Sequence, residues 1–281
     1  MERVWIRPPL TAMPRGLHRF LQSGRSSMLR LLTPVDALRT FLRGGQPLPP
    51  LWLRRHAGSL RHLRSASRQM REMVARSGLL RSGDRVLDIG CGTGAMAFEL
   101  QDLLGGGGSY IGFDVNPDAI GWCREVFRSD SRFRFEIAEM NSPNGNGAAR
   151  SVYEFPVPTA GVDFILAKSV FTHLLEPTVR SYLQETRRAL APGRKALVTA
   201  FLFARGSRTD RGASPIFAFG DDRGLVRWRW KARPESAVAY ERDHFLGLVA
   251  EAGLRVESLC QGFWPGDATR YTGQDILILA A

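Results

Sequence analysis

The chain has 281 residues, of which 44% are hydrophobic and 23% are charged, so it has enough apolar content for one large domain or two small ones. This composition excludes collagen-like, disulfide-scaffold and wholly disordered proteins. Arg, Gly or Pro interrupts every apolar stretch before the roughly 18 residues that a membrane-spanning helix needs, so we expect no transmembrane segment. The three cysteines have no metal-ligand spacing, which argues against a zinc site or disulfide framework and for a reducing, cytoplasmic location.

The formal net charge of +12 is concentrated in the N-terminal part of the chain. Residues 1–85 contain 17 arginines and 4 acidic residues, a net charge of +13, whereas the rest of the chain has a net charge of −1. Only three of the 39 basic residues are lysines, a ratio that a GC-rich coding bias can produce without any functional cause. The alternative is a basic arm that contacts nucleic-acid phosphate, anionic lipid or an acidic partner.

The N-terminal segment ends at a Gly- and Pro-rich linker, residues 44–50. Before it, residues 1–32 are rich in arginine with Glu2 as the only acid, a profile typical of a mitochondrial transit peptide. Apolar residues in the same segment recur at loose helical spacing, so a short basic helix that packs on the main domain is the alternative. We expect a basic arm and linker at 1–50, helical, disordered or targeting to the mitochondrial matrix, and one domain at 51–281.

The main domain is predicted to begin with a helix between residues 51 and 80, where apolar residues recur every three or four positions among arginines. Strands and helices alternate after it. We expect strands at 85–89, 109–113, 133–137, 162–166, 195–203, 254–260 and 275–280, and helices at 95–104, 117–127, 177–190 and 242–252. This order predicts an α/β fold, a doubly wound parallel sheet with helices on both faces.

Two irregular stretches interrupt this alternation where an α/β sheet places its substrate-facing loops. Residues 141–161 are rich in Asn, Gly and Pro and exceed an ordinary connection in length, so we expect a lid or binding loop. Residues 204–241 include Trp228 and Trp230, which alternate with cationic residues. In a strand, both indoles would lie on one face, either packed in the core or forming an aromatic wall for an acceptor.

A glycine-rich turn between a buried strand and a helix marks the candidate cofactor site. Gly90, Gly92 and Gly94 stand at every second position, and glycine's freedom at positive φ lets a ligand lie against the backbone at the helix N-terminus. With Ala95 the turn also matches the dinucleotide fingerprint, so nicotinamide and flavin cofactors are alternatives. Asp88 argues against them, because its carboxylate would repel a pyrophosphate and attract the ammonium and sulfonium of S-adenosylmethionine.

Acidic residues also end the next two strands. Asp114 follows the second strand about twenty residues after the glycine turn, where a carboxylate can accept hydrogen bonds from both ribose hydroxyls of either cofactor type. Glu139 follows the third strand and suits the adenine amino group, although an isolated residue of this kind would be read as a surface charge.

At these positions the chain resembles the class I S-adenosylmethionine-dependent methyltransferases, from about Val86 to the C-terminus. The resemblance implies a Rossmann-like, seven-stranded sheet whose last strand is antiparallel. It implies that the methionine part lies near Asp88, Gly90, Gly92 and Gly94, the ribose on Asp114, and the adenine beside Val115, Glu139 and Met140. Glu139 stands where the family usually has Asp.

A closer resemblance is to a bacterial group of small-molecule-type methyltransferases. It rests on three strings, Ser-Val-Phe-Thr-His-Leu at 169–174, Arg-Ala-Leu-Ala-Pro-Gly at 188–193 and Gly-Gln-Asp-Ile-Leu-Ile at 273–278. Arg194 follows the second string where the group usually has another Gly, a departure that we expect to be harmless in a surface turn.

Methyl transfer is an in-line displacement, so alignment supplies most of the catalysis and only some acceptors require a base. His173 follows the fourth strand on the cofactor side of the sheet and is the first base candidate, unless it caps a helix or hydrogen-bonds within its loop. His244, close to Tyr240 along the chain, is the second. Lys168 and Ser169 end the fourth strand, where they can contact cofactor or acceptor.

We therefore expect a methyltransferase that modifies an oxygen or nitrogen atom of a small-molecule or glycan-like acceptor. One alternative is an RNA or protein methyltransferase docked by the basic arm, although the arm has no evident RNA-binding motif or aromatic platform. A second alternative is a non-catalytic module that keeps the cofactor fold, against which the intact glycine turn argues.

Overall fold

The computed structural model describes residues 29, 31–36, 47–54, 60–139, 153–207, 218–220, 224–262, 264 and 273–281. The chain divides into two compact units, Met1–His62 and Leu63–Ala281. In the first unit, residues 31–36 and α2 (Leu51–Arg54) are helical, and Arg54 forms an ion pair with Asp36 at 2.5 Å. Residues 1–28 and 30, which make up most of the predicted transit peptide or short helix at 1–32, lie outside the described residues, and the boundary at residue 50 stays a prediction.

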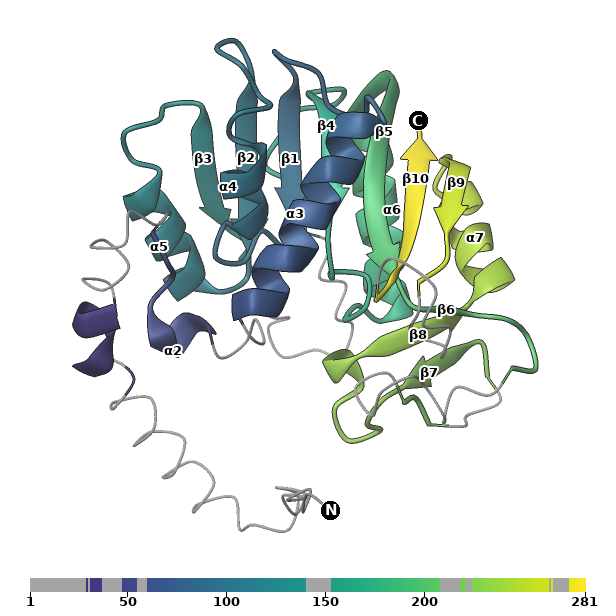
Figure 1. Ribbon diagram of the computed structural model, residues 1–281. Coiled ribbons are helices and arrows are strands. Elements are labelled where there is room, and N and C mark those ends of the chain that lie inside the picture. Colours follow the sequence, from purple (N-terminus) through teal and green to yellow (C-terminus); the bar gives the residue numbers. More distant parts are fainter. Residues whose placement is uncertain are drawn as a thin grey trace. The chain divides into compact units, whose positions relative to one another are not determined.

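The second unit contains a seven-stranded sheet with the order β3-β2-β1-β4-β5-β10-β9 (Figure 1). Its strands are β1 (Arg85–Ile89), β2 (Ser109–Asp114), β3 (Phe133–Ile137), β4 (Val162–Ala167), β5 (Leu190–Ala200), β9 (Arg255–Cys260) and β10 (Asp275–Ala280). The first five strands of this order pair in parallel, whereas β10 runs antiparallel to both β5 and β9. The prediction of a Rossmann-like α/β sheet of seven strands with the last strand antiparallel is confirmed.

Helices cover both faces of this sheet, as a doubly wound fold requires; Figure 1 shows α3 and α4 in front of the sheet and α6 behind it. The helices are α3 (Leu60–Arg76), α4 (Ala95–Leu100), α5 (Pro117–Val126), α6 (Glu176–Ala189) and α7 (Arg242–Glu251). Successive strand residues point to opposite faces. Val86 accordingly packs in one core cluster with α3, α4 and α5, and Leu87 packs in another with α6 and α7.

Two predicted boundaries of the helices and strands are wrong. The helix expected at residues 51–80 is two separate helices, α2 and α3. The strand expected from residue 195 begins at Leu190, directly after α6, with Pro192 and Gly193 inside it. Gly193 has a φ of 73°, and the pairing of β4 with β5 shifts register near the start of β5. Pro192 and Gly193, which the sequence predicts as a turn, are therefore accommodated in β5 as a local bulge.

A second, three-stranded sheet with the order β6-β8-β7 follows β5. It is formed by β6 (Leu202–Phe203), β7 (Val226–Trp228) and β8 (Val238–Glu241). The expectation that residues 204–241 are irregular is therefore wrong at β7, at β8 and at the 3₁₀ turn Pro234–Ser236. These strands are too short to show a clear period in the sequence.

The two faces of β7 have different surroundings. Trp228 packs against the core cluster that contains α6 and α7, whereas Arg227 lies on the opposite face with its guanidinium carbon 3.9 Å from the ring centroid of Phe203. Trp228 and its neighbouring cation face opposite sides, as predicted. Trp230 lies beyond the end of β7, so the expected alternation stops before it.

The chain between β3 and β4 has no helix in its described part, residues 153–161. The Phe155 N–H donates to Glu185 Oε2 of α6 at 2.7 Å, and Arg188 of the same helix donates to the Phe155 carbonyl at 3.2 Å. This part of the predicted lid is therefore fixed on α6. Residues 140–152 lie outside the described residues.

Among the helices that the structure describes, none combines the length and the apolar character needed to span a bilayer. The described residues also contain no cluster of three or more His, Cys, Asp or Glu side chains that could hold a metal ion. Cys91, Cys123 and Cys260 are free thiols.

Candidate functional site

The turn after β1 is built from three glycines in the left-handed backbone region. Gly90, Gly92 and Gly94 have φ values of 66°, 53° and 75°, which residues with a Cβ rarely adopt. A Cβ on Gly90 would lie 2.6 Å from Cγ2 of Val170, so the loop after β4 packs directly on this turn. A Cβ on Gly92 would meet no atom within 4 Å. The backbone at Gly92 therefore faces open space that a ligand can enter.

Asp114, at the end of β2, lies beside this turn. Its Oδ2 accepts a hydrogen bond from the Gly92 N–H at 2.9 Å, and its Oδ1 accepts one from the Asn116 N–H at 2.9 Å. Asn116 in turn caps α5, which begins at Pro117. Each carboxylate oxygen keeps the capacity to accept a further hydrogen bond, so Asp114 can receive two ligand hydroxyls.

Two apolar side chains are exposed beside Asp114. Val115 is 58% exposed, and Ile137, at the end of β3, is 38% exposed. Ile137 pairs with Asp114 in the parallel register of β2 and β3, a relation that sequence analysis could have used but missed. Glu139 follows and is exposed, whereas Met140 lies outside the described residues. Exposed apolar surface of this kind suits a flat, hydrophobic ligand ring.

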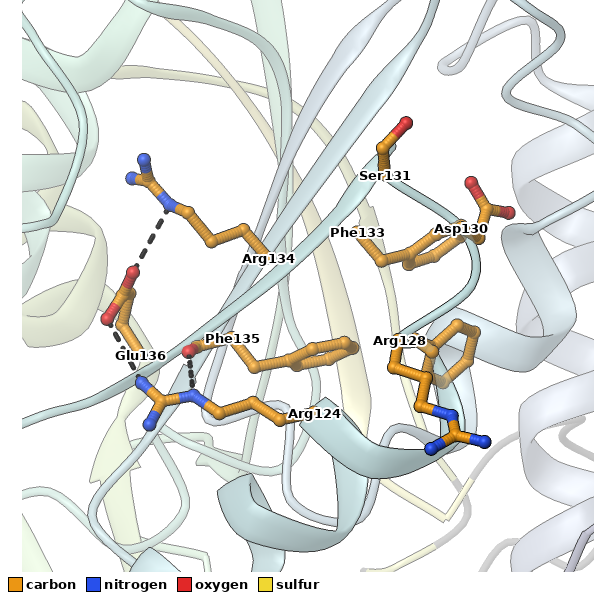
Figure 2. Close-up of a pocket in the computed structure, with 9 residues that line it drawn as sticks. Arg124, Arg128, Asp130, Ser131, Phe133, Arg134, Phe135 and Glu136 are labelled. Atoms are coloured by element: carbon orange, nitrogen blue, oxygen red, sulfur yellow. Dashed lines mark hydrogen bonds and ion pairs between the residues drawn. The ribbon is translucent and has the colours of Figure 1, made fainter.

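A separate pocket of about 240 Å³ lies between β3 and the end of α5 (Figure 2). Arg124 donates to the Phe135 carbonyl at 2.8 Å and pairs with Glu136 at 3.3 Å, and Arg134 reaches the same carboxylate at 3.3 Å. None of the lining residues belongs to the glycine turn or to the loop after β4. This pocket is therefore not part of the candidate site.

Asp88 of β1 has a fully buried carboxylate that accepts a hydrogen bond from the Tyr110 hydroxyl of β2. Burial raises the pKa of Asp88 to about 7, against the opposing effects of the Tyr110 hydrogen bond and the Lys168 charge. Lys168, directly after β4, donates to the Ser67 hydroxyl of α3 at 3.4 Å, and burial lowers the pKa of Lys168. A buried carboxylate that titrates near neutral pH becomes charged when a cation binds next to it.

The loop after β4 is fixed by Thr199 of β5 and by Gln274, which directly precedes β10. Ser169 has a φ of 60°, and its N–H donates to the Thr199 hydroxyl of β5 at 2.7 Å. The hydroxyls of Ser169 and Thr199 both donate to the Gln274 side-chain carbonyl, at 3.1 and 2.6 Å. The strings at 169–174 and 273–278 thus meet in one hydrogen-bonded group, which holds Ser169 in a conformation that costs free energy.

The next residue, Asp275, fixes the entry to the small sheet. Its buried carboxylate accepts hydrogen bonds from the Leu202 N–H at 2.7 Å, the Gly262 N–H at 2.8 Å and the Trp264 indole N–H at 2.7 Å. Burial raises the pKa of Asp275, and the three donors oppose that shift. Gln274 therefore fixes the loop after β4, and the next residue, Asp275, fixes the start of the small sheet.

His173 lies in the loop after β4 with an exposed side chain. Its Nδ1 lies 2.9 Å from the carbonyl oxygen of Glu235, in the 3₁₀ turn of the small sheet. Because a carbonyl oxygen can only accept, the neutral ring must carry its proton on Nδ1, and Nε2 then has the free lone pair. His173 therefore hydrogen-bonds across to the small sheet and keeps a basic nitrogen available.

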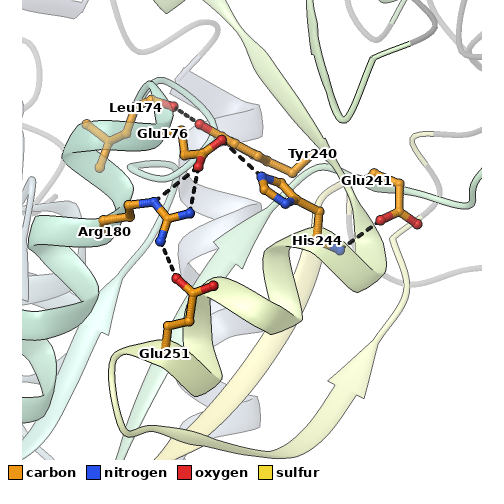
Figure 3. A network of polar contacts seen from close by, with 7 residues as sticks. All are labelled: Leu174, Glu176, Arg180, Tyr240, Glu241, His244 and Glu251. Atoms are coloured by element: carbon orange, nitrogen blue, oxygen red, sulfur yellow. Dashed lines mark hydrogen bonds and ion pairs between the residues drawn. The ribbon is translucent and has the colours of Figure 1, made fainter.

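His244, the second base candidate, lies at the start of α7 in a polar network (Figure 3). Its Nε2 is 3.0 Å from Glu176 Oε2, and Arg180 contacts the other oxygen of the same carboxylate at 2.8 Å. Arg180 also pairs with Glu251, so the network joins α6 to both ends of α7. Nε2 of His244 therefore has a carboxylate partner, whereas the described residues provide no partner for Nε2 of His173.

The comparisons with known proteins agree with this geometry. Residues 60–259 match the model of a family described as a methyltransferase domain. A curated relative, the probable cobalt-precorrin-6B C(15)-methyltransferase (decarboxylating) of Thermoplasma acidophilum, is 38% identical over 65 residues. The match spans 22% of this chain and only 32% of that relative.

Two solved structures share the fold at low identity. A complex of the Haloferax volcanii Trm112 methyltransferase activator with a methyltransferase is 15% identical, with a TM-score of 0.50 over 78% of this chain and 93% of that chain. The mitomycin 7-O-methyltransferase MmcR is 16% identical, with a TM-score of 0.50 over 77% of this chain and 53% of that chain. Because the family model covers most of the second unit, the chain belongs to the methyltransferase domain family.

Proposed function

We propose that the enzyme methylates an oxygen or nitrogen atom of a small-molecule or glycan-like acceptor, like the bacterial small-molecule-type group that it resembles. The observation that carries the proposal is Nε2 of His173, for which the described residues provide no hydrogen-bond partner, in the loop that packs on the glycine turn. The small sheet is hydrogen-bonded to this loop. The Val238 N–H donates to the Thr172 carbonyl at 2.7 Å, and the Tyr240 hydroxyl donates to the Leu174 carbonyl at 2.7 Å.

The cofactor fits the carboxyl ends of β1, β2 and β3. Open backbone at Gly92 accommodates the methionine part, and Asp88 can ionise to attract its positive charges. Asp114 has acceptor capacity for ribose hydroxyls, and Val115 and Ile137 offer apolar contacts to adenine. Bound S-adenosylmethionine supplies a methyl carbon activated by a sulfonium. The residues that we assign to the cofactor are Asp88, Gly90, Gly92, Gly94, Asp114, Val115, Ile137, Glu139, Met140 and Lys168.

His173 serves as the base in this proposal. Its Nε2 accepts the proton that an acceptor hydroxyl loses as its oxygen attacks, or the proton that a neutral amine loses after its nitrogen has taken the methyl group. The Glu235 carbonyl holds Nδ1–H and so orients the ring, and it also stabilises the positive charge that the ring gains. His244 is the weaker candidate, because Glu176 already engages its Nε2.

The experiment is a screen of the pure protein with radiolabelled cofactor against metabolite, glycan and RNA pools, followed by two matched variants. With the acceptor that is found, His173→Gln should lower kcat by about 10²–10⁴-fold and leave cofactor affinity unchanged. His244→Gln is the control and should keep most of the activity. A fully active His173→Gln enzyme would remove the base from this proposal, and labelling of RNA alone would replace the acceptor class.

The basic arm favours one second candidate, a macromolecular acceptor. The net charge of +13 in residues 1–85 would attract RNA or an acidic protein to the same catalytic domain. In this candidate the arm at 1–50 docks the acceptor and the domain at 51–281 transfers the methyl group. We assign the enzyme to the cytoplasm, with the mitochondrial matrix as the alternative if the arm is a transit peptide.

A further inference from the structure

The turn that follows β7 carries an exposed tryptophan between two arginines. Trp230 is 38% exposed. The guanidinium carbon of Arg229 lies 5.6 Å from the Trp230 ring centroid, and that of Arg233 lies 5.8 Å from it. The Arg233 N–H also donates to the Trp230 carbonyl at 2.9 Å, which closes the turn. We call Arg229, Trp230 and Arg233 the indole cluster.

Neither arginine of the indole cluster has a carboxylate partner among the residues that the structure describes. Some exposed arginines elsewhere in the domain do have a carboxylate partner, as Arg255 has in Glu257 at 3.2 Å. Both guanidinium groups make cation–π contacts with the same indole, which concentrates positive charge at this exposed turn. An oxyanion bound at this turn would offset the positive charge and accept hydrogen bonds from the planar guanidinium groups.

The indole cluster belongs to the same short turn as the group that orients His173. The Ser236 N–H donates to the Arg233 carbonyl at 3.0 Å, and Glu235, between these residues, accepts the hydrogen bond from His173 at 2.9 Å. A molecule bound at the indole cluster therefore lies against the turn whose Glu235 carbonyl is hydrogen-bonded to the base.

From this juxtaposition we propose that the acceptor carries an oxyanion, a carboxylate or a phosphate, which Arg229 and Arg233 bind while Trp230 positions their guanidinium groups. The inference rests on the proposed function, because it takes His173 as the group beside the reacting atom. Prior ordering of the two arginine side chains by the indole lowers the entropic cost of binding the anion.

The first test is a titration of the full chain with inorganic pyrophosphate at constant ionic strength, followed by tryptophan fluorescence. We expect a saturable change that Trp230→Phe abolishes and whose dissociation constant rises at least tenfold in the Arg229→Ala/Arg233→Ala double variant. Arg255→Ala, an exposed arginine outside the indole cluster, is the matched control and should bind like wild type. Equal binding by the double variant would place the anion elsewhere on this basic chain and overturn the inference.

The second test separates the inference from the proposed function. The anionic and neutral fractions of a metabolite pool are methylated with radiolabelled cofactor, and we expect label in the anionic fraction. The double variant should then show at least a tenfold higher KM with an unchanged kcat. Label only in the neutral fraction would leave the proposed function standing and overturn the inference.

If no fraction is labelled, the proposed function fails and the pyrophosphate titration alone decides the inference. The same titration with an RNA oligonucleotide covers the remaining case. A fluorescence change with RNA but none with pyrophosphate would show that the indole cluster contacts a macromolecule, which would also overturn the inference.

Discussion

Lowering the pH should weaken cofactor binding, because Asp88 must be ionised to attract the positive charges of the cofactor. Burial raises the pKa of this carboxyl to about 7, so protonation of the cofactor-free protein begins close to neutral pH. The charged and polar groups around Asp88 are Tyr110, Lys168 and Asp114. The perturbation is a change of buffer pH from about 7 to about 5, over which the cofactor amino group stays protonated.

The size of the effect follows from this pKa. With a value of about 7, the ionised fraction of Asp88 is about one half at pH 7 and about one in a hundred at pH 5. If only the ionised form binds, the dissociation constant rises about fiftyfold over this range, which corresponds to about 2 kcal/mol. Binding at pH 7 should also release about half a proton per cofactor, since the complex holds Asp88 ionised.

Isothermal calorimetry in two buffers of different ionisation enthalpy measures both quantities. Asp88→Asn should bind weakly at every pH and release no proton, which assigns the proton release to Asp88. Tyr110→Phe removes a hydrogen bond that lowers the Asp88 pKa, so the profile should move to higher pH. A dissociation constant that stays constant between pH 5 and 7 in wild type would show that Asp88 does not meet the cofactor cation.

Further predictions concern the turn, the ribose contact, the start of β10 and the arm. Gly92→Val should abolish cofactor binding in a folded domain, because its side chain would fill the open space at the backbone; calorimetry and a thermal unfolding curve check both parts. Asp114→Ala should weaken binding by about 1.5–3 kcal/mol, and unchanged affinity would leave Asp114 as a helix-flanking charge. Asp275→Ala leaves three buried N–H groups without their acceptor, so urea denaturation should show a loss of about 3 kcal/mol or more in the free energy of unfolding; a smaller loss would mean that water replaces the carboxylate. Deleting residues 1–45 should leave cofactor affinity intact, and if the arm docks nucleic acid, only the full chain should bind RNA with steep salt dependence.

The main sheet was predictable because its strands are apolar runs bounded by clear turn residues. The predicted ranges 85–89, 133–137 and 275–280 coincide with β1, β3 and β10. The prediction failed where two local tendencies conflict: Pro192 and Gly193 favour a turn, but β5 continues through them because a bulge accommodates both. Pairing with β4 and β10 outweighs the local preference there.

The candidate site was also predictable from the sequence only in part. The glycine turn and Asp114 lie on consecutive strands, so their spacing along the chain reveals them. The state of His173 depends on Glu235, 62 positions away, and the conformation of Ser169 depends on Gln274, 105 positions away. No pattern in a single sequence shows such pairings, because they arise from how the two sheets pack. The roles of His173 and of the other site residues stay predictions.

The start of β10 also orders events during synthesis on the ribosome. β10 is made after every other strand of the sheet, yet Gln274 and Asp275 at its start hold Ser169, Thr199 and Leu202. A nascent chain that has emerged only as far as β9 contains the whole glycine turn and Asp114. The loop that carries His173 still lacks the hydrogen bond from Ser169 to Gln274. The glycine turn and Asp114 can therefore fold during translation from contacts that are close in sequence. The loop that carries His173 forms its hydrogen bond to Gln274 only after about a hundred more residues have been synthesised.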